Sequence, residues 1–557
     1  MDEHTGGDAV VDVLQRAGVR VLFGMPSVHN LPIYDAIARR RTLRAVTVRH
    51  EQAAAGAADA YARVSGSLGV LLTSTGPGAA NAMGGLLEAY VSGSPVLHLT
   101  GQIETRFLDE GRGFIHEVPD QPAMLDAASK RVFRAVSADD IATVVAEAVG
   151  TALEWPRGPV SVELPIDLQY AEAVAEPPDL LDQLVSPGPC RAPDPSDVKQ
   201  AADAIVTARR PLIWAGGGAV ASGAGPQLQA LARLIGAGVL TSPNGRGVLS
   251  ERDPLCLGNL SWDRDVRQLL LDADLLIAVG TRYQGTNTEN WEMRLPASIV
   301  QIDIDPGRPA RNYAATVEVD GDASQSLNGI LEQLSGRAGT EAAWSGRVRA
   351  AGAAARSRLR ATLGAQQPLL DATERVLPSR TVVVKDSTIP AYTWGNRLLA
   401  VSRPRSSVMP NSFAIGLGLP HAIGAAAASV TTGDGEPVLL MVGDGGIMLS
   451  VGELATLAEE QLPVVVVCFC DGGYGILRNI QSKQYGRTLG VDLGRPGFVA
   501  LAQALGVTAE LVSSPSEYEA SLERALERRA PSFLEVDLDA LGPMAAPYNG
   551  TSKPPAA

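Results

Sequence analysis

The chain has 557 residues, well beyond the roughly 250–300 at which one hydrophobic core stops growing, so we expect about two to four domains. Apolar residues make up 45% of the sequence, and 47 basic against 61 acidic residues give a formal net charge of −14. No run of Lys or Arg stands out, which argues against a nucleic-acid partner. No stretch of about 18 uninterrupted apolar residues occurs, so we expect no membrane span.

The N-terminal segment and the cysteines bear on the compartment. The acidic N-terminus lacks the basic region of a secretory signal. The four cysteines include no C-x-x-C pair, so we expect free thiols in a reducing environment. The sequence therefore predicts a cytoplasmic protein.

The first region, residues 1–178, alternates strand and helix signals. Short β-branched or aliphatic runs alternate with Ala-rich helical stretches, which is typical of a parallel sheet with crossover helices. The predicted strands are Val21–Phe23, Ala45–Val48, Gly69–Thr73 and Pro95–Thr100. The Pro- and Asp-rich stretch 173–197 then predicts a linker.

The same α/β pattern occurs twice more, in residues 190–335 and 365–540. Residues 336–364, rich in Ala, Arg and Gly, predict a connecting helix, and 541–557 a flexible tail. The predicted strands of the two regions are Leu212–Ala215, Gly238–Thr241, Leu275–Val279, Ile299–Ile304, Thr381–Val384, Val438–Val442, Val464–Phe469 and Ser532–Val536. The fold class is therefore α/β, with three parallel-sheet domains.

Two aspartates follow buried strands of the third region. Val438–Val442 leads into Gly443-Asp444-Gly445, and Val464–Phe469 ends at Asp471-Gly472-Gly473. A helix between the strands would make them parallel, with both aspartates at carboxyl ends, where open α/β sheets bind ligands. Two carboxylates and a backbone carbonyl suit a Mg²⁺ ion that takes its other oxygens from a diphosphate and water. The alternative is two ordinary strand-to-helix turns.

The helix between these strands has its own start signal. Ser450 and Glu453 fit the S-x-x-E pattern of a capping box, in which each side chain bonds the backbone near the other residue. We expect this helix to run to about Glu460.

A GDG motif, a helix, a buried strand and a second acid 27 residues after Asp444 resemble the thiamin-diphosphate enzymes. The nearest subgroup is that of acetolactate synthase, benzoylformate decarboxylase and benzaldehyde lyase. The resemblance covers residues 5 to about 540 and implies three Rossmann-like domains: pyrimidine-binding, central and diphosphate-binding. It implies that Asp444, Asp471 and the Gly473 carbonyl hold the metal. The family usually has Asn where this chain has Asp471, which adds negative charge near the diphosphate. Further implied cofactor contacts are Gly445, Gly446, Tyr474 and Gly475.

An activating acid is expected in the first domain. Glu51 follows a predicted strand and opens an Ala-rich helix, in a segment that resembles the family's RHE-x-x-A motif. The family's Glu hydrogen-bonds the pyrimidine ring, which is general acid–base catalysis. The alternative is an acid favoured at a helix N-terminus by the macrodipole. The glycine-rich loop Thr73–Asn81 resembles the family loop near the pyrimidine, or is an ordinary turn.

Two segments of the third domain resemble further cofactor contacts. In NSFAIGLGLPHAIGAA, Ile415 would wedge between the cofactor rings, and the Phe413 carbonyl would accept from the pyrimidine amino group. Glycines for close helix packing are the alternative explanation of this stretch. Ser387 and Thr388 are candidates for the diphosphate. Because the family joins the Glu51 and metal halves across a subunit interface, the resemblance implies a homodimer or homotetramer.

The sequence gives less information about the side chains that contact the substrate. His29 and His116 lie in segments that resemble benzaldehyde lyase, and neutral histidines relay protons near pH 7; structural histidines are the alternative. Tyr474 and the helix after it would line the substrate side with largely apolar groups. No Arg stands at an obvious acid-binding position, so a small 2-oxo acid with an aldehyde or ketone acceptor fits better than a polyanion.

The resemblance implies an acetolactate-synthase-like carboligase or lyase that decarboxylates a 2-oxo acid and adds the resulting enamine to a second carbonyl. A simple 2-oxo acid decarboxylase is the runner-up. A non-catalytic cofactor-binding relative is a third possibility, against which Glu51 argues. Gly216-Gly217-Gly218 and Gly280-Thr281-Arg282 leave open whether the central domain binds FAD or ADP.

Overall fold

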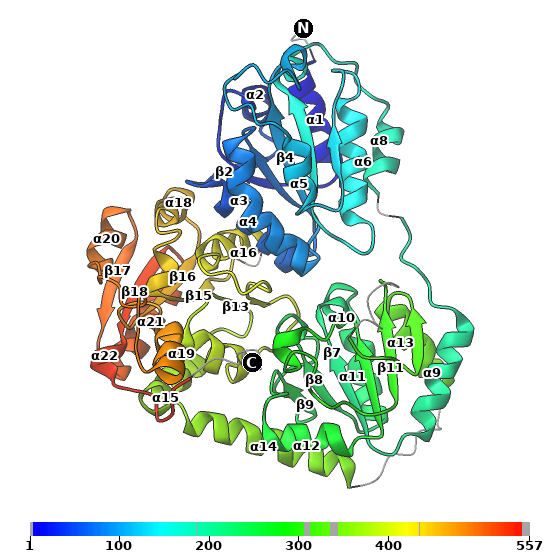
Figure 1. The fold of residues 1–557 in the computed structure, drawn as a ribbon, viewed down its shortest axis with the longest axis vertical. Coiled ribbons are helices and arrows are strands. Elements are labelled where there is room, and N and C mark those ends of the chain that lie inside the picture. Colours follow the sequence, from blue (N-terminus) through cyan, green and yellow to red (C-terminus); the bar gives the residue numbers. More distant parts are fainter. Residues whose placement is uncertain (1–3, 187, 306–311, 335–342, 434, 549–557) are drawn as a thin grey trace.

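The computed structural model describes residues 4–186, 188–305, 312–334, 343–433 and 435–548. Within these residues the chain forms three six-stranded sheets, and their neighbouring strands are parallel. The strand orders are β2-β1-β3-β4-β6-β5, β12-β11-β10-β7-β8-β9 and β14-β13-β15-β16-β18-β17. Each sheet, with its helices, forms one lobe of the molecule (Figure 1). The predicted fold class is confirmed.

The first lobe contains elements α1 to α8. Its strands are β1 (Val21–Gly24), β2 (Arg44–Thr47), β3 (Gly69–Thr73), β4 (Val96–Gln102), β5 (Val132–Arg134) and β6 (Val160–Pro165). Its helices are α1 (Gly6–Arg16), α2 (Leu31–Arg40), α3 (Glu51–Ser65), α4 (Pro77–Ser92), α5 (Gln121–Asp126), α6 (Ile141–Leu153), α7 (Ile166–Tyr170) and α8 (Pro178–Val185). Helix α8 lies inside the predicted linker. It folds because Leu181 and Val185, one turn apart, are both buried in this lobe's core.

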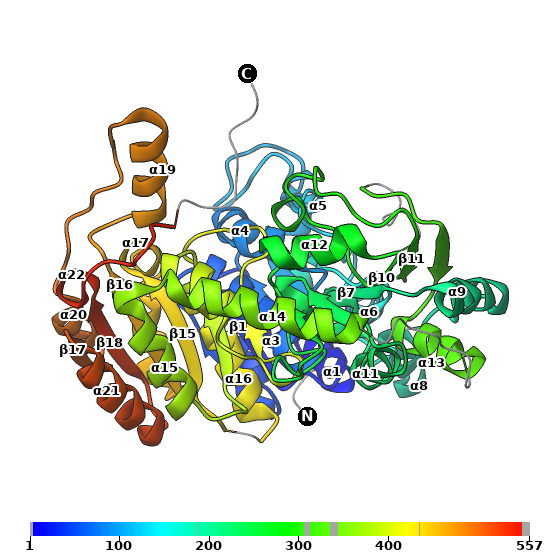
Figure 2. The same ribbon diagram turned by 90° about the horizontal axis from the view of Figure 1, so that it is seen from below.

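The central lobe follows, and a long helix leads out of it. Its strands are β7 (Pro211–Ala215), β8 (Gly238–Thr241), β9 (Cys256–Gly258), β10 (Leu275–Val279), β11 (Ile299–Asp303) and β12 (Val317–Asp320). Its helices are α9 (Pro195–Thr207), α10 (Gly217–Ala221), α11 (Gly225–Leu234), α12 (Arg264–Asp272) and α13 (Ala323–Gln333). Helix α14 (Trp344–Ala361) then runs from beside α12 to the third lobe (Figure 2). The predicted connecting helix is thus present, although 336–342 lie outside the described residues.

The third lobe carries the GDG motif. Its strands are β13 (Val382–Lys385), β14 (Ser407–Val408), β15 (Val438–Gly443), β16 (Val464–Cys470), β17 (Thr508–Val512) and β18 (Ser532–Asp537). Its helices are α15 (Gln367–Val376), α16 (Gly418–Thr431), α17 (Asp444–Ile447), α18 (Glu453–Glu460), α19 (Gly475–Tyr485), α20 (Phe498–Ala504), α21 (Pro515–Arg528) and α22 (Leu538–Leu541).

The segment after α22 is packed, unlike the flexible tail that the sequence predicts. Met544 packs against the third lobe's core, and the Ala546 amide donates to the Thr362 carbonyl at 3.2 Å. Tyr548 stacks on Tyr392, with ring centroids 6.2 Å apart. The remainder of the predicted tail, 549–557, lies outside the described residues.

The first and third lobes share one hydrophobic core, formed where α3 packs on α16. Both helices are rich in small residues, which let their backbones approach closely. A Cβ on Gly424 would lie only 1.9 Å from the Ala57 carbonyl oxygen, and one on Gly56 2.9 Å from Pro420 Cβ. This contact fixes the two lobes of one chain relative to each other.

The structure bears on the expectations of no membrane span and of free cysteine thiols. Within the described ranges we find no helix with the length and apolar character needed to cross a membrane. The four cysteines are free thiols, of which Cys190 is exposed and the other three are buried.

Candidate active site

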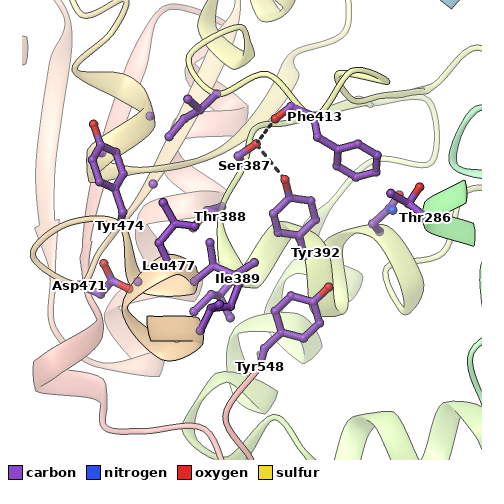
Figure 3. A pocket seen from close by; sticks show the side chains of 18 of the residues that line it. Thr286, Ser387, Thr388, Ile389, Tyr392, Phe413, Asp471, Tyr474, Leu477 and Tyr548 are labelled. Atoms are coloured by element: carbon purple, nitrogen blue, oxygen red, sulfur yellow. Dashed lines mark hydrogen bonds between the residues drawn. The ribbon is translucent and has the colours of Figure 1, made fainter. Parts of the chain in front are cut away.

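A pocket of about 480 Å³ opens at the carboxyl ends of β13, β15 and β16, facing the central lobe. This volume lies within the range of small-molecule sites. The described residues that line the pocket include every cofactor contact that the sequence predicts in the third lobe: Ser387, Thr388, Phe413, Ile415, Asp444, Gly445, Gly446, Asp471, Gly473, Tyr474 and Gly475. Figure 3 shows Ser387, Thr388, Phe413, Asp471 and Tyr474 around it.

Asp444 begins α17, directly after β15, and is 6% exposed. Its Oδ1 accepts from the Gly445 amide at 2.9 Å, and its Oδ2 accepts from the amides of Gly472 and Gly473 at 2.8 and 3.1 Å. Burial nevertheless raises its pKa above the usual value. Asp444 therefore ties the turn after β16 to the end of β15.

Asp471 lies on that second turn, beside the start of α19. Burial, and after it the negative charge of Asp444, raise the pKa of Asp471 to about 6. The nearest cation is Arg478, whose Nη1 lies 4.0 Å from Asp471 Oδ2. A Cβ on Gly475 would lie 1.8 Å from the same carboxylate oxygen, so only glycine fits there.

These residues fit a divalent cation. Two half-buried or buried carboxylates raise each other's proton affinity when no cation lies between them, and a metal ion relieves this repulsion. In the described ranges no group of three or more His, Cys, Asp or Glu side chains suits a metal ion. An ion held by Asp444 and Asp471 would therefore take further oxygens from a backbone carbonyl, a bound diphosphate and water.

The predicted capping box is wrong. Helix α18 starts after Gly452, with no side-chain cap, and within the described residues Ser450 Oγ is buried without a partner. Glu453 points instead to the first lobe, where its Oε1 accepts from the Arg49 amide at 2.9 Å, and its Oε2 accepts from Thr456 Oγ1 at 2.7 Å. The S-x-x-E pattern is thus overridden by a tertiary contact two residues before Glu51.

The loop 409–417 brings Phe413 and Ile415 into the pocket. Phe413 has a φ of +60°, which is unusual for a residue with a large side chain. Its carbonyl oxygen accepts from Ser387 Oγ at 3.3 Å, and Ser387 Oγ accepts from Tyr392 Oη at 2.9 Å (Figure 3). This carbonyl therefore faces the pocket wall formed by the end of β13.

A second cluster of predicted site residues lies on the first lobe. Glu51 begins α3 and accepts from Asn81 Nδ2 at 3.0 Å. A Cβ on Gly78 would lie 3.2 Å from Glu51 Oε1 and 2.9 Å from Ser74 Cβ, so the glycine-rich loop runs between these side chains. Gly76 has a φ of +56°, and a Cβ there would meet the His116 carbonyl oxygen at 2.1 Å.

The two predicted histidines belong to this cluster. Ser74 Oγ hydrogen-bonds His29 Nδ1 at 3.3 Å and His116 Nδ1 at 3.1 Å, and the imidazole centroids are 5.2 Å apart. Burial, and after it the positive charge of His116, lower the pKa of His29 to about 4. His29 is therefore neutral near pH 7. We call Glu51, His29, Ser74 and His116 the proton cluster.

The chain does not bring its proton cluster to its own pocket. Among the described residues that line the pocket, none is Glu51, His29 or His116. The central lobe contributes the opposite wall instead, through Asn259, Trp262 and Thr286.

Several pocket residues were not predicted from the sequence. Tyr392 follows Ser387 on the same segment, and Tyr548 comes from the segment that was expected to be flexible. Arg397 also lines the pocket, with its guanidinium carbon 5.8 Å from the Tyr548 ring centroid. Arg397 is therefore a cation of the pocket lining that the sequence did not single out.

A separate groove of about 350 Å³ lies at the carboxyl ends of β7, β10 and β11. Gly217, Gly218, Gly280 and Arg282, which the sequence singled out, line it together with Asp303. A Cβ on Gly216 would lie 2.1 Å from the Gly280 carbonyl oxygen, so close packing requires glycine at this position whether or not a ligand binds in the groove.

Comparison with known proteins places all three lobes in one family. Residues 4–124, 198–330 and 390–536 match the N-terminal, central and C-terminal domain models of the thiamine pyrophosphate enzymes. A probable acetolactate synthase large subunit from Methanocaldococcus jannaschii is 32% identical, over 96% of this chain and 92% of the relative. The isozyme 2 large subunit of acetolactate synthase from Escherichia coli is 29% identical, over 96% of each chain.

A further relative carries a different name. A probable 2-ketoarginine decarboxylase from Pseudomonas aeruginosa is 33% identical, over 96% of this chain and 94% of the relative. The matched domains and the full-length relatives agree with the three parallel sheets and the GDG pocket. The chain belongs to the thiamine pyrophosphate enzyme family, as an enzyme of the acetolactate synthase group.

Proposed function

We propose that the active centre forms between two copies of the chain, with the proton cluster of one protomer facing the pocket of the other. The observation that carries this proposal is the separation of the two halves: the acids and apolar groups line a cavity, while Glu51 and the histidines do not. Both halves lie at carboxyl ends of parallel strands, where α/β sheets bind ligands. A homodimer therefore completes two equivalent centres, and a homotetramer four.

Thiamin diphosphate supplies a nucleophilic carbon and an electron sink for the reaction of a 2-oxo acid. Asp444, Asp471 and the Gly473 carbonyl would hold Mg²⁺, and Ser387, Thr388 and the glycines after Asp444 would contact the diphosphate. The Phe413 carbonyl would accept from the pyrimidine amino group, and Ile415 would wedge between the rings. Tyr474 and Gly475 complete this wall. The buried, mutually repelling carboxylates support this assignment.

The proton cluster would move protons. Glu51, fixed by Asn81, would hydrogen-bond the pyrimidine ring and exchange a proton with its nitrogen. His29, neutral near pH 7 because burial lowers its pKa, would accept or return a proton at the reacting carbonyl, with Ser74 orienting both imidazoles. The apolar residues of α19 would exclude water from the substrate.

We further propose a carboligase that decarboxylates a 2-oxo acid and joins the product to an aldehyde or ketone. The acetolactate synthase relatives support this reaction. Arg397 gives the pocket a guanidinium that suits the carboxylate of such a substrate. The relative named as a 2-ketoarginine decarboxylase favours a second candidate, simple decarboxylation with release of an aldehyde.

Product analysis separates these candidates. Protein freed of ligands is incubated with thiamin diphosphate, Mg²⁺ and either pyruvate or 2-ketoarginine, with and without an added aldehyde, and the products are identified by mass spectrometry. An acyloin or acetohydroxy acid supports the carboligase, and free aldehyde alone supports the decarboxylase. Failure to take up the cofactor with any divalent ion would contradict both.

The glycine-lined groove of the central lobe supports a nucleotide as a further ligand, either FAD or an ADP-containing molecule. Gly217 and Gly218 at the start of α10 allow close approach of a diphosphate, and Asp303 suits ribose hydroxyls. Native mass spectrometry of purified protein, with flavin absorbance as the second readout, tests this. Protein that binds neither FAD nor ADP at millimolar concentration contradicts it.

A further inference from the structure

The last turns of helix α4 carry a buried carboxylate, Glu88, that accepts hydrogen bonds from another lobe. Glu88 is 0% exposed, although a buried carboxylate is costly unless hydrogen bonds or ion pairs compensate it. Its neighbours in its own lobe are Ser92, whose Oγ donates to Oε1 at 2.8 Å, and Arg63, whose Nη1 lies 3.6 Å from Oε1. Its other partners belong to the third lobe.

These partners are the first residues of the segment that lines the pocket. The Asn411 amide donates to Glu88 Oε1 at 2.7 Å, and the Ser412 amide donates to Oε2 at 2.9 Å. Ser412 Oγ donates to the same Oε2 at 2.5 Å. One carboxylate thus satisfies two backbone amides and a hydroxyl immediately before Phe413.

The far end of the segment is held by another buried carboxylate, Asp386, after β13. It accepts from the Gly416 amide at 3.1 Å and from the Gly418 amide at 2.9 Å. Between these anchors lie Phe413, in its left-handed conformation, and Ile415. Because such a backbone conformation is strained, it persists only when its surroundings hold it.

We propose that Glu88 is a positioning residue for the cofactor: it fixes the segment 411–416 so that the Phe413 carbonyl and the Ile415 side chain face thiamin diphosphate. The proposal rests on the proposed function, because it assumes that these two groups contact the cofactor. A segment that must order itself upon binding lowers affinity, whereas a preorganised one does not. The first lobe of a chain therefore shapes the pocket of that same chain, although its proton cluster serves the partner.

The test compares Glu88→Gln with Glu251→Gln in the full-length protein. Glu251 is a matched control, because it is also a nearly buried carboxylate that accepts a backbone amide of the third lobe, that of Val401 at 2.9 Å, and among the described residues its hydrogen bonds do not involve segment 411–416. In Glu88→Gln, one acceptor oxygen becomes an NH₂ group that faces donors. We expect its dissociation constant for thiamin diphosphate, titrated at fixed Mg²⁺ by isothermal calorimetry, to rise at least tenfold. In Glu251→Gln, it should change less than twofold.

Two further variants separate positioning from stability. Ser412→Ala removes the hydroxyl that donates to Glu88 and accepts from the Ala414 amide at 3.3 Å, but leaves both backbone amides that donate to Glu88, and we expect roughly threefold weaker cofactor binding with an unchanged Tm. Glu88→Gln combined with Ile415→Ala should weaken binding by less than the product of the single effects, because both act through Ile415.

The outcomes are distinct. Wild-type protein that does not bind thiamin diphosphate contradicts the proposed function. Wild-type protein that binds it, with Glu88→Gln and Ser412→Ala binding equally well, overturns the positioning role and leaves the proposed function standing. If Glu88→Gln does not fold, wild-type affinity in Ser412→Ala alone overturns the role.

Discussion

The proton cluster of the first lobe and the pocket of the third lobe lie at equivalent places in their sheets but carry different chemical groups. Each collects side chains from turns at the carboxyl edge of a six-stranded parallel sheet of the described chain. The pocket encloses about 480 Å³ and holds two carboxylates at neighbouring strand ends. The proton cluster holds a carboxylate and two imidazoles joined through Ser74.

The difference lies in what each half lacks. The pocket carries charge for a metal ion and apolar walls. Besides the two aspartates and Arg397, the titratable groups among its described lining residues are three tyrosines, Tyr392, Tyr474 and Tyr548. The proton cluster carries groups that exchange protons near neutral pH, but it does not line that pocket. Neither half explains catalysis alone, which is why the assembly of two chains is central to the proposal.

The largest effect should come from Glu51→Gln. Glutamine keeps the size and the hydrogen bond to Asn81, but it exchanges no proton with a ring nitrogen. We expect kcat to fall by about 10²–10⁴-fold, while the dissociation constant for thiamin diphosphate changes much less. Steady-state kinetics and calorimetry measure the two quantities. Asn81→Asp, which leaves Glu51 in place, should cost less activity; full activity in Glu51→Gln with every substrate would remove its catalytic role.

Mixing two inactive variants tests the sharing of the centre directly. Asp444→Ala removes the pocket's anchor, and Glu51→Gln removes the proton cluster's acid. If the halves meet across an interface, a mixed dimer has one centre with both defects and one intact centre. Random exchange of equal amounts should then restore about one quarter of wild-type activity. Activity that stays at the level of the separate variants, after mass spectrometry has verified exchange, would mean that each chain builds its centre alone.

The residues of the pocket and of the proton cluster could be predicted from the sequence because each set lies in a local sequence pattern. Aliphatic runs that end in Gly-Asp-Gly and Asp-Gly-Gly predict two strands with an acid at each end. Because parallel strands align their carboxyl ends, these patterns also predict that the two acids lie close together. The sequence likewise predicts Glu51 as the first residue of a helix that follows a strand. The patterns do not give the distance between Glu51 and Asp444, because that depends on how α3 packs on α16 and on a second chain.

The misses have physical reasons. The S-x-x-E pattern at Ser450 is local, but Glu453 gains more from the Arg49 amide of another lobe than from a cap. Strand β14 has only two residues, and β17 is partly exposed, so neither shows a buried run. Tyr548 comes from a stretch rich in Pro, Gly and Ala whose order depends on stacking against Tyr392.

A smaller effect is expected where this chain differs from the family's usual Asn. Asp471→Asn removes one negative charge beside Asp444 but keeps an oxygen that can bind a metal ion. We expect the Mg²⁺ concentration for half-maximal activity to rise about three- to tenfold, with kcat at saturating Mg²⁺ within about threefold of wild type. Asp203→Asn is the control, because this exposed acid pairs with Lys199 on α9 of the central lobe and the same single charge is removed. An unchanged Mg²⁺ requirement in Asp471→Asn would show that residue 471 is not a ligand.

The smallest effect concerns His29 and sharpens the description of the proton cluster. Its folded-state pKa of about 4 lies below the ordinary value of 6.5. Between these values the unfolded chain binds a proton that the folded chain does not, so His29 lowers the free energy of unfolding as pH falls from 6.5 towards 4. His29→Asn should remove this contribution, roughly 1–3 kcal/mol at pH 4, and flatten that part of the curve.

Urea unfolding at a series of pH values measures this slope. Val28→Ala, at an exposed neighbouring position, should leave it unchanged. The same variant pair separates stability from chemistry, because His29→Asn should also lower kcat at pH 7, where His29 is neutral and able to accept a proton. If His29→Asn flattens the stability curve but retains wild-type kcat at pH 7, His29 is a buried structural histidine, and His116 with Glu51 must carry the proton transfers of the first lobe.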